Sequence, residues 1–261
     1  MFAEERHRLI GGLVASQGKV TVAELSGQFD ITRETVRRDL AHLEKSGVLR
    51  RVHGGAVSAA KASTAEESLS TRTARNLSDK RRIAAKALEL IPSGSASVVL
   101  DAGTTTELLA AQMVETLSPR RDSDLLVITH AVPIAYRIST ASDFALEVLG
   151  GRVRGLTSAA LGNRTIEQLG ALRPDIAFVG ANGVHPEFGL STPDPMEAAV
   201  KSAIVRSARR VVVLADASKL DVETLVRFAT LDDIDTLVTT GTPGRALAAA
   251  LEQADIEVVS A

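Results

Sequence analysis

The sequence has no cysteine, no tryptophan and few aromatic residues of any kind. Phe, Tyr and Trp together make up 3% of its 261 residues. Without cysteine the chain can form no disulfide, no thiolate nucleophile and no cysteine-ligated metal site. Its five histidines show no His-x-x-x-His spacing, so we predict no metal site and no cofactor. The scarcity of aromatic rings also argues against single-stranded nucleic acid as a ligand, because proteins bind such strands largely by stacking bases on aromatic side chains.

Long apolar stretches are missing as well. The longest run without Lys, Arg, Asp or Glu has 12 residues, 125–136, whereas a membrane-spanning helix needs about 20 apolar residues. Residues 1–5 lack the apolar core of a signal peptide. We therefore expect a cytoplasmic protein with no membrane partner, long enough for one small domain and one with a sizeable core.

The chain as a whole also carries no excess of positive charge, and its formal net charge is −2. Residues 1–60 nevertheless hold 9 basic and 7 acidic side chains, and the remainder holds 21 and 25. This charge balance argues against a protein that covers polyanions non-specifically through its overall positive charge. Any affinity for DNA must come from a local basic face in the N-terminal part, doubled by dimerisation.

Two short helices near the N-terminus form a pattern typical of a helix-turn-helix. Thr21 and Glu24 have the spacing of a capping box and predict a helix over residues 22–29. Thr32 then caps a second helix, whose apolar residues face inward and whose polar residues are left near or on the outer face. Those outward residues are Arg33, Thr35, Arg37 and Arg38. They are placed to enter a major groove.

Arginine suits this task because its planar fork can bind a phosphate or both acceptors on a guanine edge. The alternative is a solvated helix whose charges pair at helical spacing. Residues 47–56 favour the first interpretation, because they predict a small hairpin with a basic strand and a glycine turn, as in a wing. The predicted DNA contacts are Thr21, Thr32, Arg33, Thr35, Arg37, Arg38, Arg50, Arg51 and His53.

Residues 58–79 are rich in Ala, Ser and Thr and show no apolar period, so they predict a linker that leads into a helix beginning near Ser78. The expected domains are therefore 1–57, which binds DNA, and 80–261. In the second domain seven β-rich runs alternate with helical ones, which predicts a mainly parallel α/β sheet. The runs are 97–101, 125–129, 145–149, 176–180, 211–215, 235–239 and 256–259.

Small and polar residues follow these strands, where ligands of open α/β sheets bind. Residues 101–106 combine glycine, three threonines and a helix start, which suits a phosphate, although a plain threonine-capped turn is the alternative. Lys219 after the fifth strand can hold a phosphate or be simply solvated. A lone histidine such as His130 is more often structural. The spacing of Glu197 and Lys201 predicts an intrahelical ion pair by default.

Two sets of residues carry a family resemblance over nearly the whole chain. The N-terminal set is Arg6, Ile10, Gly18, Glu24, Leu25, Phe29, Thr35, residues 37–40, Leu43, Gly47 and residues 51–56. The C-terminal set is Arg72, Lys80, residues 83–84, 101–105, 150–151, Gly180, Gly183, 189–192, Glu197, Lys201, 216–219, Phe228 and Asp235. Through both sets the chain resembles the DeoR family of transcriptional regulators.

The resemblance implies a winged helix-turn-helix joined to a sensor related in fold to ribose-5-phosphate isomerase and glucosamine-6-phosphate deaminase. It further implies a homodimeric or homotetrameric repressor of a sugar-catabolism or sugar-uptake operon, which a phosphorylated sugar releases from double-stranded operator DNA. Similarity of residues 1–6, 189–192 and 197–203 to actinobacterial regulators of fructose uptake makes fructose 1-phosphate or fructose 1,6-bisphosphate the leading effector. Sugar phosphates of other pathways are the alternatives.

From the strand ends and the resemblance, the predicted effector contacts are Asp101, Gly103, Thr104, Thr105, Thr106, His130, Gly151, Asn182, Gly183, Glu197, Lys201 and Lys219. His130 stands where the family commonly has Asn, and Thr32 where it commonly has Ser. The place of Arg72 in the family pattern leaves open whether part of the linker docks on the sensor.

Two other functions fit parts of the pattern. A sugar-phosphate isomerase or deaminase could use Asp101, Glu197 and Lys219 for acid–base chemistry, but such an enzyme has no use for a winged helix, and we predict no enzymatic activity. A transcriptional activator would keep every residue role of the repressor.

Overall fold

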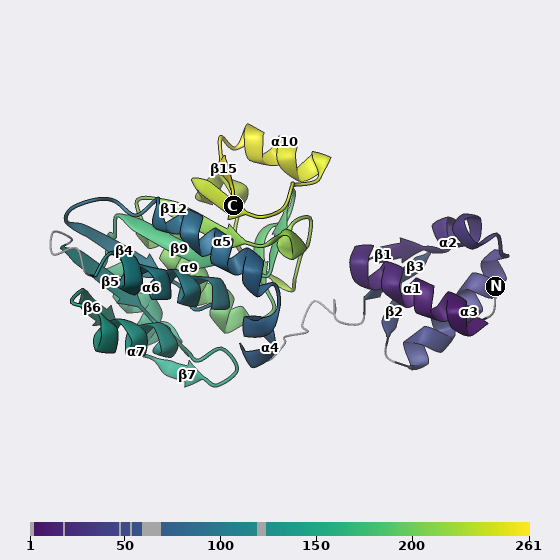
Figure 1. Ribbon diagram of the computed structural model, residues 1–261, viewed down its shortest axis with the longest axis horizontal. Helices are drawn as coiled ribbons and strands as arrows, with labels where there is room; N and C mark the ends of the chain where they lie inside the picture. The colour runs from purple at the N-terminus through teal and green to yellow at the C-terminus, as the bar shows by residue number, and fades with distance from the viewer. Residues whose placement is uncertain (1–2, 18, 47, 53, 59–68, 119–123) are drawn as a thin grey trace. The chain divides into compact units, whose positions relative to one another are not determined.

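The computed structural model describes residues 3–17, 19–46, 48–52, 54–58, 69–118 and 124–261. Its internal contacts divide the chain into two compact units, Met1–Ala65 and Glu66–Ala261 (Figure 1). Each unit has its own hydrophobic core and is described by itself.

The N-terminal unit consists of three helices and a small antiparallel sheet with strand order β1-β3-β2. The helices are α1 (Ala3–Gln17), α2 (Val22–Phe29) and α3 (Arg33–Lys45), and the strands are β1 (Lys19–Thr21), β2 (Leu49–Val52) and β3 (Gly55–Ser58). The bounds of α2 are those that the capping box predicts. The Thr21 hydroxyl accepts the Glu24 amide at 3.2 Å, and the Glu24 carboxylate accepts the Thr21 amide at 2.8 Å.

The wing predicted from residues 47–56 is the hairpin of β2 and β3. It folds back against β1, with Thr21 opposite Gly55. A Cβ at Gly55 would lie 2.1 Å from the Val20 carbonyl oxygen, so only glycine lets the wing approach this strand. Ile10, Leu25 and Leu40, one from each helix, pack together in the core and are almost completely buried. The fold therefore holds α3 and the wing together as one rigid body.

The C-terminal unit is built on a seven-stranded sheet with the order β15-β14-β12-β9-β4-β5-β6, every pair of which is parallel. All seven predicted runs are strands of this sheet. They are β4 (Ala96–Leu100), β5 (Leu125–Thr129), β6 (Ala145–Val148), β9 (Ile176–Gly180), β12 (Val211–Ala215), β14 (Thr236–Thr239) and β15 (Glu257–Ser260). The predicted fold class, a winged helix-turn-helix followed by a mainly parallel α/β domain, is confirmed.

Helices cover both faces of the sheet (Figure 1). Helices α5 (Leu77–Leu88), α6 (Thr104–Thr116) and α7 (Val132–Ala141) share a core with Val98 and Leu100 of β4. Helices α8 (Asn163–Gly170), α9 (Pro195–Ser207) and α10 (Arg245–Gln253) share the other core with Val99. Successive residues of a strand point to opposite faces, which explains why the central strands β4, β5, β9 and β12 are almost entirely apolar instead of alternating.

Five further strands form two small antiparallel sheets that the sequence did not predict. They are β7 (Arg152–Arg154) paired with β8 (Ala159–Leu161), and β10 (Gly183–His185), β11 (Gly189–Thr192) and β13 (Val226–Ala229). With three or four residues each, they are too short to show a period.

Helix α4 (Leu69–Ala74) lies within the stretch expected to form a linker and packs against α6. Arg72 thus docks on the C-terminal unit, which settles the alternative that the family pattern left open. No helix among the described residues is long and apolar enough to cross a bilayer.

Candidate functional site

The outer face of α3 presents its arginines to solvent. Arg33, Arg37 and Arg38 are exposed, and Thr35 is half-buried. Thr32 caps the helix as predicted, because its hydroxyl oxygen accepts the Thr35 amide at 3.2 Å. The cap fixes the N-terminal turn, which is the part of a recognition helix that meets base edges.

Arg37 forms an ion pair with Glu34 at 3.4 Å, as expected for the alternative of a solvated helix with paired charges. Both side chains are more than half exposed, at 59% and 73%. Exposed pairs of this kind contribute about 0–1 kcal/mol and are screened by salt. The pair therefore leaves Arg37 able to exchange its partner for a phosphate.

The inner face of α3 is held by a charge cluster. Asp39 accepts hydrogen bonds from Arg6 Nε at 2.6 Å and Arg6 Nη2 at 3.0 Å, and its Oδ1 lies 2.8 Å from His7 Nε2. Burial raises the pKa of Asp39, but the hydrogen bonds from Arg6 and His7 outweigh it and hold the pKa below its usual value. The His7 ring stacks on that of His42, with centroids 4.5 Å apart. Asp39 thus ties the recognition helix to α1.

The wing stands next to this helix. The Arg51 amide donates to the Glu44 carboxylate at 2.8 Å, and the Arg51 side chain is exposed. Residues of α3 and the wing, among them Arg37 and Arg51, line a shallow hollow between them. The hydroxyl of Thr21, another predicted DNA contact, caps α2. The Arg50 side chain and His53, both predicted DNA contacts, lie outside what the structure describes.

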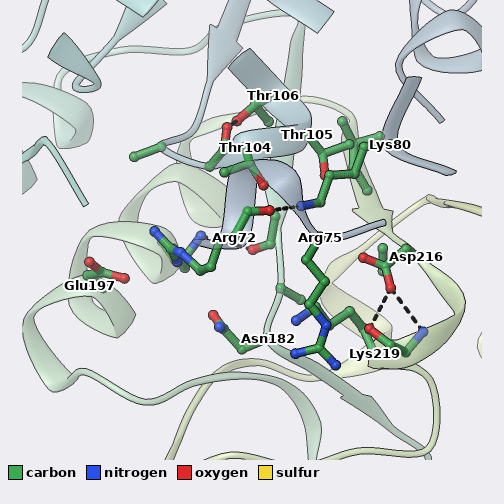
Figure 2. Close-up of a pocket in the computed structure, with 18 residues that line it drawn as sticks. Arg72, Arg75, Lys80, Thr104, Thr105, Thr106, Asn182, Glu197, Asp216 and Lys219 are labelled. Carbon is green, nitrogen blue, oxygen red and sulfur yellow. Dashed lines mark hydrogen bonds between the residues drawn. The ribbon is translucent and has the colours of Figure 1, made fainter. Parts of the chain in front are cut away.

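In the C-terminal unit, a pocket opens at the carboxyl ends of three neighbouring strands (Figure 2). Its wall is formed by residues 102–106 after β4, 180–182 after β9 and 214–216 with 218–219 at the end of β12. Arg72, Lys80, Glu197 and Lys201 from three helices complete it, together with Arg75, which directly follows α4. The strand order brings the predicted loops to one place, as parallel strands require.

Positive charge dominates the pocket lining. Five lysines and arginines face two carboxylates, Glu197 and Asp216. The start of α6 adds backbone amides that no side chain caps, because Gly103 precedes the helix. Helix starts and cation clusters both stabilise anions. The pocket is therefore suited to a small anion with hydroxyl groups, for which Thr104, Thr105 and Asn182 offer hydrogen bonds.

Eight of the predicted effector contacts line this pocket: Gly103, Thr104, Thr105, Thr106, Asn182, Glu197, Lys201 and Lys219. Among them, Thr106 is committed elsewhere, because its hydroxyl lies 2.7 Å from the Asp101 carbonyl and 2.8 Å from that of Gly103. That hydroxyl fixes the loop and leaves Thr104 and Thr105 as the half-buried threonines of the wall.

Asp101, also a predicted contact, lies beneath the pocket and is completely buried. Its carboxylate accepts hydrogen bonds from Lys201 and, at 3.0 Å, from the Gly180 amide. Burial raises the pKa of Asp101, but the Lys201 ammonium and the hydrogen bond with His130 outweigh it and keep the pKa low. This buried carboxylate holds Lys201 in place and does not line the pocket itself.

His130 is buried beside Asp101, at 3.2 Å, and does not line the pocket. Its Nδ1 donates to the Ala160 carbonyl at 2.9 Å, since a carbonyl oxygen only accepts. Its Nε2 lies 3.2 Å from the Ala102 amide. The ring therefore connects the end of β5 to the loop after β4, which is the structural role expected of a lone histidine.

Two predicted glycines serve chain packing and not the pocket wall. A Cβ at Gly151 would lie 2.3 Å from the Thr165 hydroxyl, and one at Gly183 would lie 2.3 Å from the Val222 carbonyl. Neither residue lines the pocket. Glycine is required there because two chain segments approach closely.

The default ion pair between Glu197 and Lys201 is not the one that forms. Glu197 accepts Arg154 at 3.1 Å, and Lys201 pairs with Asp101 and donates to the Gly180 carbonyl at 2.9 Å. Both side chains are about nine-tenths buried or more. Each therefore reaches the pocket in a fixed position.

Sequence reasoning missed Arg75 as part of this site and left Arg72 and Lys80 without a role. All three precede β4, the first strand of the large sheet, and lie far in sequence from the strand ends where ligands were expected. Lys80 donates to the Arg72 carbonyl, and Asn76 between them donates to Asp216 at 3.1 Å. The available signal was the cluster of basic residues over 72–82. Among the described residues, no group of three His, Asp or Glu side chains is placed to hold a metal.

Models of two protein families match the chain. Residues 6–62 match the DeoR-like helix-turn-helix domain, and residues 75–241 match the DeoR C-terminal sensor domain. Together the two matches include every described residue of both sites except Arg72.

Curated relatives match over nearly their full length. The chain is 35% identical to the HTH-type transcriptional regulator FruR of Bacillus subtilis over 240 residues, 92% of each chain. It is 34% identical to the HTH-type transcriptional regulator GlpR of Haloferax volcanii, covering 99% of this chain and 98% of the relative. It is 30% identical to the glycerol-3-phosphate regulon repressor of Escherichia coli, covering 92% and 91%. These relatives are transcriptional regulators and not enzymes.

Among solved structures, the chain is similar to ribose 5-phosphate isomerase A from Methanocaldococcus jannaschii. The sequences are 20% identical, the match covers 56% of this chain and 55% of that one, and the TM-score is 0.42. A likeness of this degree carries no argument about activity.

Proposed function

Because this chain belongs to the DeoR family of transcriptional regulators, we propose that it represses a sugar-uptake or sugar-catabolism operon and leaves its operator when a phosphorylated sugar binds. The N-terminal unit would bind double-stranded DNA, and the pocket at the carboxyl edge of the large sheet would bind the effector. Operator and effector both belong to the cytoplasm, where we expect the protein to act.

The observation that carries the proposal is the composition of the pocket. Five cationic side chains and an uncapped helix start surround it, together with hydroxyl and amide side chains. A phosphoryl group needs the first set, and sugar hydroxyls need the second. The eight lining residues predicted as effector contacts, with Arg72, Arg75 and Lys80, form the proposed binding site.

The proposed DNA contacts follow from exposure and position. Arg33, Arg37 and Arg38 on α3 would enter the major groove, and Arg51 on the wing would reach the adjoining backbone. A single unit of this size makes few contacts. We therefore propose a homodimer or homotetramer, so that two recognition helices meet half-sites about one helical turn apart.

The names of the relatives narrow the search for the effector. One relative is named FruR and another is a glycerol-3-phosphate regulon repressor. For this chain we propose fructose 1-phosphate or fructose 1,6-bisphosphate, with glycerol 3-phosphate as the first alternative. All three carry a phosphoryl group next to hydroxyls, as the pocket lining favours.

The test is a gel shift on DNA from the gene's own upstream region at fixed ionic strength, because DNA affinity depends steeply on salt. The panel holds these three compounds, their unphosphorylated counterparts and inorganic phosphate. We expect one specific complex, released by a phosphorylated compound and not by its unphosphorylated counterpart. A complex that no phosphorylated compound weakens would contradict release by a sugar phosphate. A complex that one of them strengthens would favour the opposite sign of regulation, as in some activators.

A further inference from the structure

Helix α4 belongs to the pocket and also leads to the DNA-binding unit. Arg72 of α4 and Arg75, which directly follows the helix, line the pocket, as Figure 2 shows. Along the chain, only residues 59–68 separate α4 from β3 of the wing. By covalent connection alone, α4 is therefore the part of the pocket nearest to the DNA-binding unit.

A hinge between α4 and α5 is tied to the opposite wall of the pocket. Asn76 has a φ of 52°, in the left-handed region that few residues other than glycine adopt. Its side-chain amide donates to Asp216 Oδ1 at 3.1 Å and to the Ser218 hydroxyl at 3.5 Å. Both partners lie in the loop that also carries Lys219. The conformation of the hinge thus depends on a loop that the effector would contact.

Lys80 lies among other cationic side chains close to α4. Burial, together with the positive charges of Lys219, Arg72 and Arg75, lowers the pKa of Lys80, and Asp216 only partly opposes the shift. The Lys80 ammonium nevertheless donates to the Arg72 carbonyl, at the end of α4. These four cationic side chains all line the pocket, and an anion among them would relieve their repulsion.

Building on the function proposed above, we propose that a phosphoryl group in the pocket stabilises α4 in its docked position through Arg72 and Arg75, and that this helix passes the occupancy of the pocket to the DNA-binding unit. The hinge at Asn76 is then a positioning residue for the response and not a residue that binds the effector. Ligand binding and DNA release become separable by mutation, because the coupling between two sites is a free energy of its own.

The test uses Asn76→Gly in the full chain. Glycine accepts the left-handed φ, so the fold is retained, while the tie to Asp216 and Ser218 is lost. Calorimetry measures the affinity for the panel compounds and inorganic phosphate, and a gel shift measures the concentration that releases the operator. Hydrogen exchange of residues 69–74 reports on α4, with residues 245–253 of α10 as an internal control. A second variant, Arg75→Gln, removes one cation, and Arg81→Gln on the exposed face of α5 is its matched control.

In the wild type we expect the releasing compound to slow exchange in 69–74 and not in 245–253. In Asn76→Gly we expect ligand affinity to stay within about threefold, while release requires about tenfold more ligand than binding does. Arg75→Gln should weaken ligand binding about tenfold, and Arg81→Gln should behave as the wild type.

Three results would overturn the inference while leaving the proposed function intact: unchanged exchange in 69–74, release that follows binding in Asn76→Gly as in the wild type, or no effect of Arg75→Gln. A wild-type complex that no panel compound releases would contradict the proposed function, and this inference with it.

Discussion

The recognition helix and the buried part of the pocket use positive charge in opposite ways. On α3 the arginines Arg33, Arg37 and Arg38 are exposed, and Glu34, which pairs with Arg37, is exposed too. In the pocket Lys80 and Lys201 are both 5% exposed, and each donates to a fixed carbonyl or carboxylate oxygen.

The difference matches the anions that we propose for each site. DNA is a long polyanion that supplies its own geometry, so exposed and adaptable side chains are sufficient and the phosphate contacts add up along the backbone. A small phosphorylated compound offers one or two anionic groups, so a site must hold its cations in place beforehand to gain affinity and selectivity. Each side chain can therefore be tested for membership of one class or the other.

The largest expected effect separates the two units. Replacing Arg37 and Arg38 together by Ala should weaken operator binding by about 2 kcal/mol for each contact, while leaving effector affinity unchanged. The salt dependence of the remaining binding should also fall, since fewer counterions are released. Gel shifts and calorimetry measure the two affinities.

The control removes the same charge from the other unit, in Arg173→Ala with Arg206→Ala, both exposed. Equal losses of DNA affinity in the two double variants would mean that net charge, and not the face of α3, binds DNA.

The next effect concerns the buried charges. Asp101→Asn leaves the Lys201 ammonium buried without its carboxylate, and breaking such a pair costs about 3 kcal/mol or more. Urea denaturation followed by circular dichroism should show this loss in the free energy of unfolding. Asp143→Asn, at an exposed position, should change it little. A fully stable Asp101→Asn protein would place Lys201 among the adaptable cations.

The third prediction uses pH to probe the charge cluster behind α3. The folded pKa of Asp39 lies below its unfolded value, so the cluster contributes stability above the unfolded pKa of about 4 and loses it as pH falls through the folded pKa. Asp39→Asn should lower stability at pH 7 by about 2 kcal/mol and flatten this acid dependence.

Urea denaturation between pH 3 and pH 7 measures both quantities. Asp30→Asn is the matched control, because Asp30 is exposed at the end of α2 and asparagine accepts its left-handed φ of 49°. If stability depends as steeply on acid pH in Asp39→Asn as in the wild type, the Asp39 cluster does not cause that dependence.

The smallest effect lies in the pocket wall. Thr105→Val keeps the shape and removes the hydroxyl, so effector affinity should fall by about 1 kcal/mol, or roughly fivefold. Operator binding without effector should stay the same. Thr116→Val at the exposed far end of α6 controls for the change in helix propensity. A loss of DNA affinity in Thr105→Val would contradict the separation of the effector pocket from the DNA-binding surface.

Patterns local in sequence predicted the helix-turn-helix, the wing and the seven strands of the large sheet. The capping box at Thr21 and the apolar runs of the parallel strands both act within a few residues, so they are readable without the fold. The Asp39 cluster was not readable, because Arg6 is 33 residues away. Asp101 was predicted to line the pocket for the same reason: its partners Lys201 and His130 are distant from it in sequence. Arg75 precedes β4, the first strand of the large sheet, and comes close to the strand ends only in the folded structure.

The central claim is that pocket and DNA-binding surface are linked, and linkage is reciprocal. The most direct test measures the affinity of the full chain for the releasing compound twice, free and saturated with operator DNA. The account predicts that operator lowers this affinity by the same factor by which the compound lowers affinity for the operator. An effector affinity that is identical with and without operator would contradict it.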